Sequence, residues 1–227
     1  DIVLNLLDRF GASELLGKAI EIYGDEVDGL SLDDRVTISS MATELGAIIL
    51  LFPPNRAVIR YCEARAGQKI KEIKADPDAE YAGIYELDVV TFEPKISRPG
   101  KPHDTTSINH LPWIKIDSAF IGSCTNGRIE DMRKAAEVLR NRKVAPGVIL
   151  KIVPATDLVW QRCLDEGLMH IFKEAGALIS NAGCAGCAAG QVGQNGPGGV
   201  TVSTGNRGLP GKQGKGEVYL ASPAIVA

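Results

Sequence analysis

The sequence predicts an α/β protein with mainly parallel sheets that helices cover on both faces. After residue 114, strand-like segments alternate with segments of helical spacing, as they do in parallel α/β domains. The strand-like segments are nearly continuous apolar runs, which is typical of strands buried on both faces. The chain has 227 residues and an apolar content of 44%, enough for one or two domains with buried cores.

Residues 1–93 predict a first α/β domain. An apolar pattern with helical spacing covers residues 2–22 and is interrupted at Gly11. Ser31, followed by Asp33 and Asp34, is a helix start signal and predicts a helix over 31–45. The remaining expected elements are a strand at 47–52, a helix at 55–66, and short strands at 84–87 and 89–92.

Residues 94–113 predict a linker, and residues 114–227 predict the second domain. The linker contains Pro94, Pro99, Pro102 and Pro112 and few apolar residues. The elements expected after it are, in order, a strand at 118–122, a helix at 129–141, a strand at 148–153, a helix at 157–175 that breaks near residue 167, and strands at 178–181, 199–203 and 218–221.

Charge and hydropathy limit the kinds of partner. A net charge of −3 at pH 7 and an isoelectric point of about 5.7 argue against a protein that binds nucleic acid by neutralising phosphates. The longest apolar run, near residues 47–54, is too short to cross a bilayer. We therefore expect no nucleic-acid partner and no membrane partner.

The ends of the chain and its cysteine count bear on its origin. No signal peptide is recognisable, and an odd number of five cysteines is typical of a reducing compartment, so we expect a cytoplasmic location. The first residue is not methionine, and helical patterns are interrupted at both ends. We expect the chain to be a piece of a longer polypeptide.

Three cysteines lie in loops of small and polar residues. Cys124 follows the strand expected at 118–122, and Cys184 and Cys187 form a C-x-x-C pair after the strand expected at 178–181. The carboxyl ends of parallel strands share one edge of a sheet, so the three thiols should converge there. Three thiolates leave one corner of a metal cluster open to a substrate. A zinc site with a distant fourth ligand and three reduced core cysteines remain alternatives.

A second polar group follows the strand expected at 199–203. Arg207 has a planar guanidinium group that suits a carboxylate, and Lys212 adds a second positive charge. Asn206 can donate from its side-chain amide to a sulfide or a substrate. By composition alone this segment is a solvated surface loop. Its position in line with the cysteine loops favours a functional site.

Other candidate residues have simpler interpretations. Glu44 lies in the last turn of the helix expected at 31–45, where the sequence alone favours an ordinary glutamate, although a carboxylate is slightly unfavourable at that end. Cys62 and Cys163 each lie four residues after a valine in a helical pattern, which predicts core positions. His170 is expected to be solvated.

The motifs together resemble those of the aconitase superfamily. The matching residues are Ile121-Gly122-Ser123-Cys124-Thr125-Asn126, Asn181-x-x-Cys184-x-x-Cys187, Asn206-Arg207 with Gly211 and a cation, Ala221-Ser222-Pro223, and residues 27–53 with Met41 and Glu44. Within the superfamily, the chain is most similar to the large subunits of 3-isopropylmalate dehydratase and homoaconitase. The resemblance covers nearly the whole chain and implies two consecutive three-layer α/β/α domains of the iron–sulfur region.

The resemblance also implies a cofactor, a reaction and a partner. It implies a [4Fe-4S] cluster held by Cys124, Cys184 and Cys187, in an enzyme that dehydrates and rehydrates a hydroxy di- or tricarboxylic acid. The unligated iron would act as a Lewis acid on the leaving hydroxyl group. The other implied roles are substrate binding for Arg207 and Lys212, contact with the cluster for Asn206, and a hydrogen bond to the iron-bound water for Glu44. The serine base would belong to a separate small subunit, the swivel domain.

Departures from the family pattern leave the substrate open. Ser40 stands where the family usually has asparagine, Lys212 replaces an arginine, and Gly208-Leu209 replaces Asn-Phe. A lysine lacks the bidentate contact of an arginine. The alternatives are a leucine-pathway, a lysine-pathway or a dimethylmalate-like hydroxy acid, or a non-catalytic scaffold that binds RNA. The family's upstream catalytic domain is absent from the sequence, so we expect the chain to be inactive alone.

Overall fold

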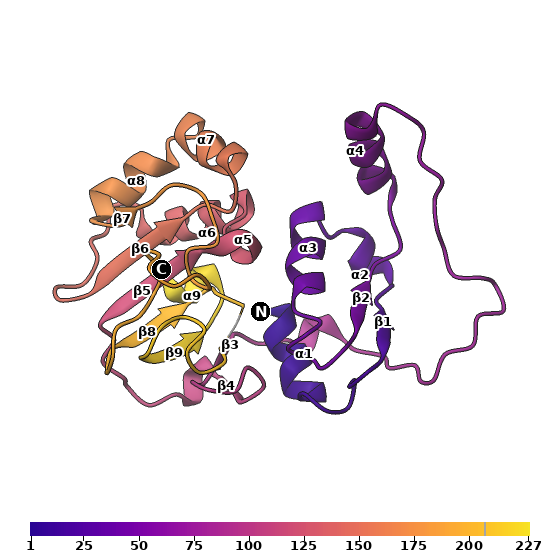
Figure 1. The fold of residues 1–227 in the computed structure, drawn as a ribbon, viewed down its shortest axis with the longest axis horizontal. Helices are drawn as coiled ribbons and strands as arrows, with labels where there is room; N and C mark the ends of the chain where they lie inside the picture. Colours follow the sequence, from indigo (N-terminus) through magenta and orange to yellow (C-terminus); the bar gives the residue numbers. More distant parts are fainter. Residues whose placement is uncertain (207) are drawn as a thin grey trace.

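The computed structural model describes residues 1–206 and 208–227, and it contains two sheets (Figure 1). The smaller sheet has two strands in the order β1-β2. The larger sheet has seven strands in the order β4-β3-β9-β8-β5-β6-β7. Each sheet has its own cluster of buried apolar side chains. The predicted α/β class with a mainly parallel sheet is confirmed, and the division into domains at 1–93 and 114–227 stays a prediction.

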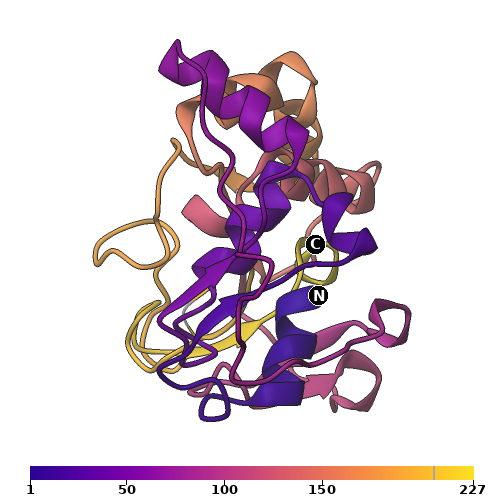
Figure 2. The ribbon, with the colours of Figure 1, turned by 90° about the vertical axis from the view of Figure 1, so that its right-hand side faces the viewer.

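The smaller sheet pairs two distant segments in parallel. It consists of β1 (Ala19–Glu21) and β2 (Ile49–Leu51). The helix α1 (Ile2–Phe10) supplies five of the apolar side chains of its core, and α3 (Leu32–Ser40) contributes Ile38, with Met41, Ala42 and Leu45 following in the turns after α3. Two further helices lie in this part of the chain, α2 (Asp25–Asp28) and α4 (Arg56–Ala66). Figure 2 views the protein from the side of this smaller part.

Local start signals set the bounds of the helices. The Ser31 hydroxyl accepts from the backbone N–H of Asp34, and the Asp34 carboxylate accepts from the backbone N–H of Ser31, so α3 begins with a capping box. The Asn55 side chain accepts from the backbone N–H of Val58 and begins α4. Both starts agree with the prediction.

Three predicted elements of the first part are wrong. The interruption expected at Gly11 is confirmed, because α1 ends at Phe10 and Gly11 takes a positive φ of 61°. The helical pattern expected to continue to residue 22 is wrong, because β1 forms there and pairs with β2. Residues 84–87 are irregular, and η1 (Val89–Thr91) is a short 3-10 helix rather than a strand. The Asp88 side chain accepts from the backbone N–H of Val90 and begins this turn, a local bond that competes with strand formation.

The larger sheet has the strand order that positions the candidate site. The middle one of its five parallel strands, β5 (Ser118–Gly122), is buried along its whole length and pairs in parallel with two neighbours, β6 (Ile149–Val153) and β8 (Val200–Ser203). The outer parallel strands are β7 (Leu178–Ile179) beside β6 and β9 (Glu217–Leu220) beside β8. Each of these strands was expected from the sequence.

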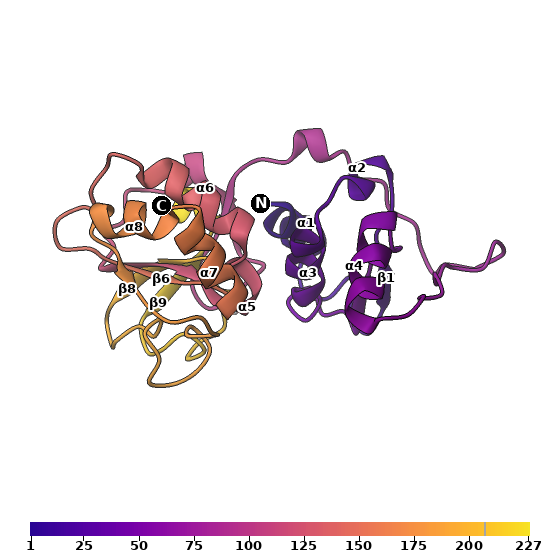
Figure 3. The ribbon, with the colours of Figure 1, turned by 90° about the horizontal axis from the view of Figure 1, so that it is seen from above.

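The two faces of the larger sheet are covered differently. Ala119 and Ile121 of β5 belong to the main core, with side chains from the helices α6 (Ile129–Leu139), α7 (Asp157–Asp165), α8 (Leu168–Ala175) and α9 (Pro223–Val226). Figure 3 shows α6, α7 and α8 on one side of the sheet. Phe120, which lies between Ala119 and Ile121 along the strand, packs on the opposite face with Val153, Ala185 and Val192.

Residues 94–113 are not the irregular linker that their prolines suggest. They contain β3 (Lys95–Ser97), β4 (Thr105–Ser107) and the short helix η2 (Ile108–His110). β3 pairs antiparallel with β4 and, through Ser97 and Leu220, with β9. The prolines lie just outside these strands, where the missing N–H breaks no ladder bond. This segment therefore extends the larger sheet to its edge.

No helix in the described ranges is both long enough and apolar enough to span a membrane.

The smaller part contacts the larger one through α1, since the Lys95 ammonium group lies 3.1 Å from the Asp8 carboxylate and the Thr105 hydroxyl donates to Asp8 at 2.7 Å. Residues 67–88 form an exposed loop that extends outward from the smaller part (Figure 1) and returns to it where the Tyr81 hydroxyl donates to Glu21 of β1 and the Tyr85 ring packs on Phe10.

Candidate functional site

The three candidate cysteines lie in loops that follow strands of the larger sheet. Cys124 lies in α5 (Ser123–Asn126), directly after β5, and Cys184 and Cys187 lie in the segment between β7 and β8. All five cysteines of the chain are thiols, and Cys124 and Cys187 are exposed while Cys184 is half-buried. β5 and β7 both run parallel to β6, so both loops leave the sheet at its carboxyl edge.

The turn that carries Cys124 is flanked by two glycines, Gly122 and Gly127, at positions where a side chain would not fit. Gly122 has a φ of 151°, and a Cβ atom there would lie 2.2 Å from the carbonyl oxygen of Val153. A Cβ atom at Gly127 would lie 2.6 Å from the carbonyl oxygen of Ser123. β5 and β6 therefore approach each other closely at this turn, and the backbone around Cys124 has little freedom.

Thr204 connects this turn to the next loop of the site. It follows β8, is buried, and accepts from the backbone N–H of Gly122 at 2.9 Å while its hydroxyl donates to the Gly122 carbonyl at 3.1 Å. The side-chain amide of Asn126 donates to the Thr204 carbonyl at 2.5 Å. The Cys124 turn is thus bound to the start of the loop that carries Asn206.

The loop that carries Cys184 and Cys187 is held at several points. The backbone N–H of Gly183 donates to the Pro154 carbonyl at 3.1 Å, after the end of β6. Inside the loop, the Gln194 side-chain amide donates to the Gly186 carbonyl. The Phe120 ring packs against the loop, and a Cβ atom at Gly193 would lie 2.6 Å from that ring.

The structure brings Asn206 beside one of the cysteines. Asn206 is buried, and its Oδ1 atom lies 4.0 Å from Sγ of Cys187. The Lys212 side chain is exposed, while its backbone carbonyl accepts from the Gln194 amide at 3.3 Å. Arg207 lies outside the described residues.

The thiols suit an iron–sulfur cluster by type and by placement, but they do not form a preassembled cage. Among residues 1–206 and 208–227, no three histidine, cysteine, aspartate or glutamate side chains lie close enough together to hold a metal ion. The donor set fits: three thiols in small-residue loops at one sheet edge, with a buried amide beside one of them. To bind one cluster, the side chains of the two loops would have to come closer together.

Glu44 is buried, which the sequence alone did not predict. It lies in the turns after α3, with an exposure of 6%. α3 itself contacts the Cys124 turn, because the Thr37 hydroxyl donates to the Thr125 carbonyl at 2.9 Å and the Ser40 hydroxyl lies 3.4 Å from the Thr125 hydroxyl. The first part of the chain therefore reaches the edge of the site.

The sequence predicted core positions for the other two cysteines and a solvated position for one histidine. Cys163 is fully buried in the main core, as predicted, and burial raises the pKa of its thiol to about 11. Cys62 is only half-buried on α4, a helix without buried residues, so its predicted core position is wrong. His170 is exposed, as expected, and lies 3.3 Å from the Glu174 carboxylate.

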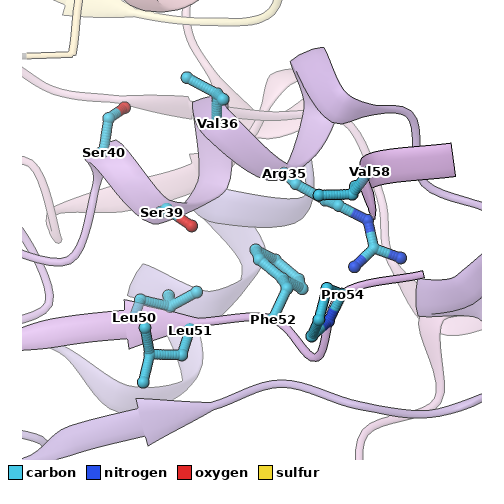
Figure 4. Close-up of a pocket in the computed structure, with 9 residues that line it drawn as sticks. All are labelled: Arg35, Val36, Ser39, Ser40, Leu50, Leu51, Phe52, Pro54 and Val58. Carbon is cyan, nitrogen blue, oxygen red and sulfur yellow. The ribbon is translucent and has the colours of Figure 1, made fainter. Parts of the chain in front are cut away.

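A hollow of about 460 Å³ lies between α3, β2 and the start of α4 (Figure 4). The Arg35 guanidinium group at its border donates to the carbonyls of Val27, Leu30 and Pro53, so it is a structural group of the first part. None of the six described site residues lines this hollow; its lining consists of Arg35, Val36, Ser39, Ser40, Leu50, Leu51, Phe52, Pro54 and Val58.

Several residues that hold the loops were missed by the sequence analysis. Ser203, Thr204, Gln194, Asn195 and Gln213 bond to the loops around the cysteines. Nothing in their spacing distinguishes them from other polar residues of a glycine-rich segment. The burial of Ser203, Thr204, Asn195 and Gln213 becomes visible only in the fold.

Comparison with known proteins agrees with this arrangement. The family model for aconitase (aconitate hydratase) matches residues 1–227, and the chain belongs to the aconitase family.

Among curated relatives, the 3-isopropylmalate dehydratase large subunit of Acetivibrio thermocellus is 42% identical over 229 residues. The probable 3-isopropylmalate dehydratase large subunit of Methanothermobacter thermautotrophicus is 40% identical over 229 residues. The 3-isopropylmalate dehydratase large subunit 1 of Pyrococcus abyssi is 42% identical over 231 residues. Each comparison covers 100% of this chain and 55% of the relative, so the chain spans about half the length of these relatives.

Proposed function

We propose that this chain provides the cluster-binding region of a [4Fe-4S] hydro-lyase large subunit that dehydrates and rehydrates a hydroxy di- or tricarboxylic acid. The observation that carries the proposal is the placement of Cys124, Cys184 and Cys187 at one sheet edge, with Asn206 beside Cys187. Membership of the aconitase family and the names of the relatives support it. The first candidate substrate is 3-isopropylmalate.

The three cysteines would hold the cluster. When bound, a cluster with three protein ligands supplies a Lewis-acidic iron for the leaving hydroxyl group. Asn206 would contact the cluster or substrate, because its side chain is buried beside Cys187, with Oδ1 toward the thiol. Arg207 and Lys212 would bind substrate carboxylates, and Glu44 would contribute a buried carboxylate.

The proposal includes a partner and a location. The relatives are named as large subunits, and this supports a small subunit that carries the swivel domain and the serine base. A homoaconitase-type or dimethylmalate-type substrate is the alternative, since Lys212 lacks the fork of an arginine. Thiol ligands need a reducing compartment, which supports a cytoplasmic location.

Anaerobic reconstitution of the 227-residue chain with iron and sulfide tests the proposal. We expect a brown protein with broad visible absorbance and bound iron and sulfide. Serine substitutions at Cys124, Cys184 and Cys187 should each remove the absorbance and leave the fold intact, as measured by circular dichroism. Cys62→Ser, on a helix outside the site, is the matched control and should keep the colour. A colourless protein that holds zinc tightly would disprove the cluster.

A further inference from the structure

The Gln213 side chain connects two loops of the candidate site. It is 4% exposed, although it lies in a segment rich in glycine. Its Nε2 atom donates to the Gly193 carbonyl at 3.0 Å, in the loop of Cys184 and Cys187. Its Oε1 atom accepts from the Ser203 hydroxyl at 2.8 Å, at the end of β8. One amide group thus connects the loop of Cys184 and Cys187 to the end of β8 in the larger sheet.

The end of β8 holds both cysteine loops through two consecutive residues. The Ser203 side chain reaches the loop of Cys184 and Cys187 through Gln213, and the Thr204 side chain binds Gly122 in the Cys124 turn. Successive side chains of a strand point to opposite faces, so two adjacent residues can serve two loops. The relative position of the two loops then depends on both connections.

The surroundings of Gln213 require an amide. The Ser203 hydroxyl, which donates to Gln213, also accepts from the backbone N–H of Gly205 at 2.9 Å. A Cβ atom at Gly205 would lie 3.0 Å from Oε1 of Gln213, so there is little space around the amide. The group must donate at one end and accept at the other. A carboxylate lacks the donor, and a thioether lacks the donor and is only a weak acceptor.

The backbone of Gln213 adds a further connection. Its carbonyl accepts from the backbone N–H of Asn195 at 2.9 Å, at the end of the cysteine loop. The Asn195 side chain donates to the carbonyls of Gly199 and Glu217 at 2.8 and 3.1 Å. The end of the loop is therefore bound to the starts of β8 and β9. The Gln213 amide is a connection that reaches back into the cysteine loop, beside the Gln194 amide, which donates to the carbonyls of Gly186 and Lys212.

We propose that Gln213 is a positioning residue that sets the place of the Cys184 and Cys187 loop relative to β8. The effect of Gln213 on cluster binding rests on the function proposed above, whereas its effect on the position of the loop does not. Substitution of Gln213 should loosen residues 186–195 and reduce the retention of iron. The loss of a buried donor and acceptor pair is expected to speed local opening about tenfold.

Hydrogen exchange of the cluster-free 227-residue chain tests this role. Gln213→Met is isosteric and removes both hydrogen bonds, and Gln213→Glu removes only the donor toward Gly193. Asn5→Leu is the matched control, because Asn5 is also a buried amide and donates to the carbonyls of Asp1 and Glu93. We expect both Gln213 variants to speed exchange at the amides of Gln194 and Asn195 about tenfold, and the Asn5 variant to leave them unchanged.

Two results would overturn the positioning role: wild-type exchange in residues 186–195 of both Gln213 variants, or equal acceleration in Asn5→Leu. If only Gln213→Glu folds, its exchange rates decide the same question. Iron retention after reconstitution separates this inference from the proposed function. A wild-type chain that takes up no iron disproves the proposed function, while exchange still decides the role of Gln213. Equal iron retention together with wild-type exchange in the Gln213 variants disproves only the positioning role.

Discussion

The buried hydroxyl of Thr204 stabilises the start of the turn that carries Cys124. Gly122 is the last residue of β5, and its N–H and its carbonyl both bond to this hydroxyl. A buried backbone N–H without a partner costs free energy, so the turn that carries Cys124 depends on this side chain.

We therefore predict that Thr204→Val lowers the free energy of unfolding by about 1–3 kcal/mol, because valine keeps the shape and leaves the Gly122 N–H without its acceptor. Urea unfolding followed by circular dichroism measures the loss. Thr43→Val is the matched control, since Thr43 is exposed, and it should be nearly neutral. Equal effects of the two substitutions would contradict the role given to Thr204.

Single residues also show what the sequence could predict of the site. The three cysteines and Asn206 follow strands whose apolar runs are clear in the sequence, so their placement at one edge was predictable. The burial of Glu44 was not predictable, because it depends on the tertiary packing around the turns that follow α3. The bridge of Gln213 was not predictable either, because Gly193 and Ser203 become its neighbours only when the loops fold.

For helices and strands as well, features set by neighbouring residues were predictable, and features set by pairing with distant residues were not. The starts of α3 and α4 depend on caps within four residues, and their prediction from the sequence was right. β1 has only three residues and pairs with residues 49–51, so its apolar spacing also fitted a helix. β3 pairs with β9 through Ser97 and Leu220, far apart in the sequence, and the prolines around it are typical of a linker.

The strand character of β3 can be tested through its central side chain. Ile96 is 4% exposed and belongs to the main core. Ile96→Ala should lower the free energy of unfolding by about 2–5 kcal/mol, because it removes buried methyl groups and leaves a cavity. Val90→Ala is the control, since Val90 is 87% exposed in the adjacent segment. Urea unfolding distinguishes a buried strand from a mobile linker. If residue 96 lay in a mobile linker, Ile96→Ala would cause no loss in the free energy of unfolding.

At the scale of the whole molecule, the two parts meet at polar contacts beside the candidate site. Arg128, just before α6, lies 3.4 Å from the Asp33 carboxylate of α3. The Asp131 carboxylate in the first turn of α6 accepts from the backbone N–H of Arg128 at 3.0 Å. Asp34 and Glu130 are further carboxylates near Asp131, and the Lys134 ammonium group partly offsets them. This contact therefore joins acidic groups from both parts.

The ionisation of Asp131 should make this contact depend on pH. Burial raises the pKa of Asp131 from 3.8 to about 6. Since the folded pKa lies above the unfolded value, the folded state retains the proton between about pH 4 and about pH 6, and stability falls as the pH rises through this window. The pKa of Asp8 is lowered because the hydrogen bond from Thr105 and the Lys95 ammonium group outweigh burial, and the pKa of Glu166 is lowered by Arg133. These two groups act in the opposite direction, since their stabilisation is lost when the pH falls below about 4.

Asp131→Asn isolates the first effect, because an asparagine can still accept from the N–H of Arg128 but carries no charge. We expect the variant to unfold with a free energy about 1 kcal/mol above that of the wild type at pH 7, and the difference to disappear near pH 4. Urea unfolding at a series of pH values measures it. Asp165→Asn, at the end of α7, is the control for the loss of an exposed carboxylate and should give a flat difference. A difference for Asp131→Asn that is constant from pH 4 to pH 7 would show that folding does not change the pKa of Asp131, and that the contact between the two parts does not respond to its ionisation.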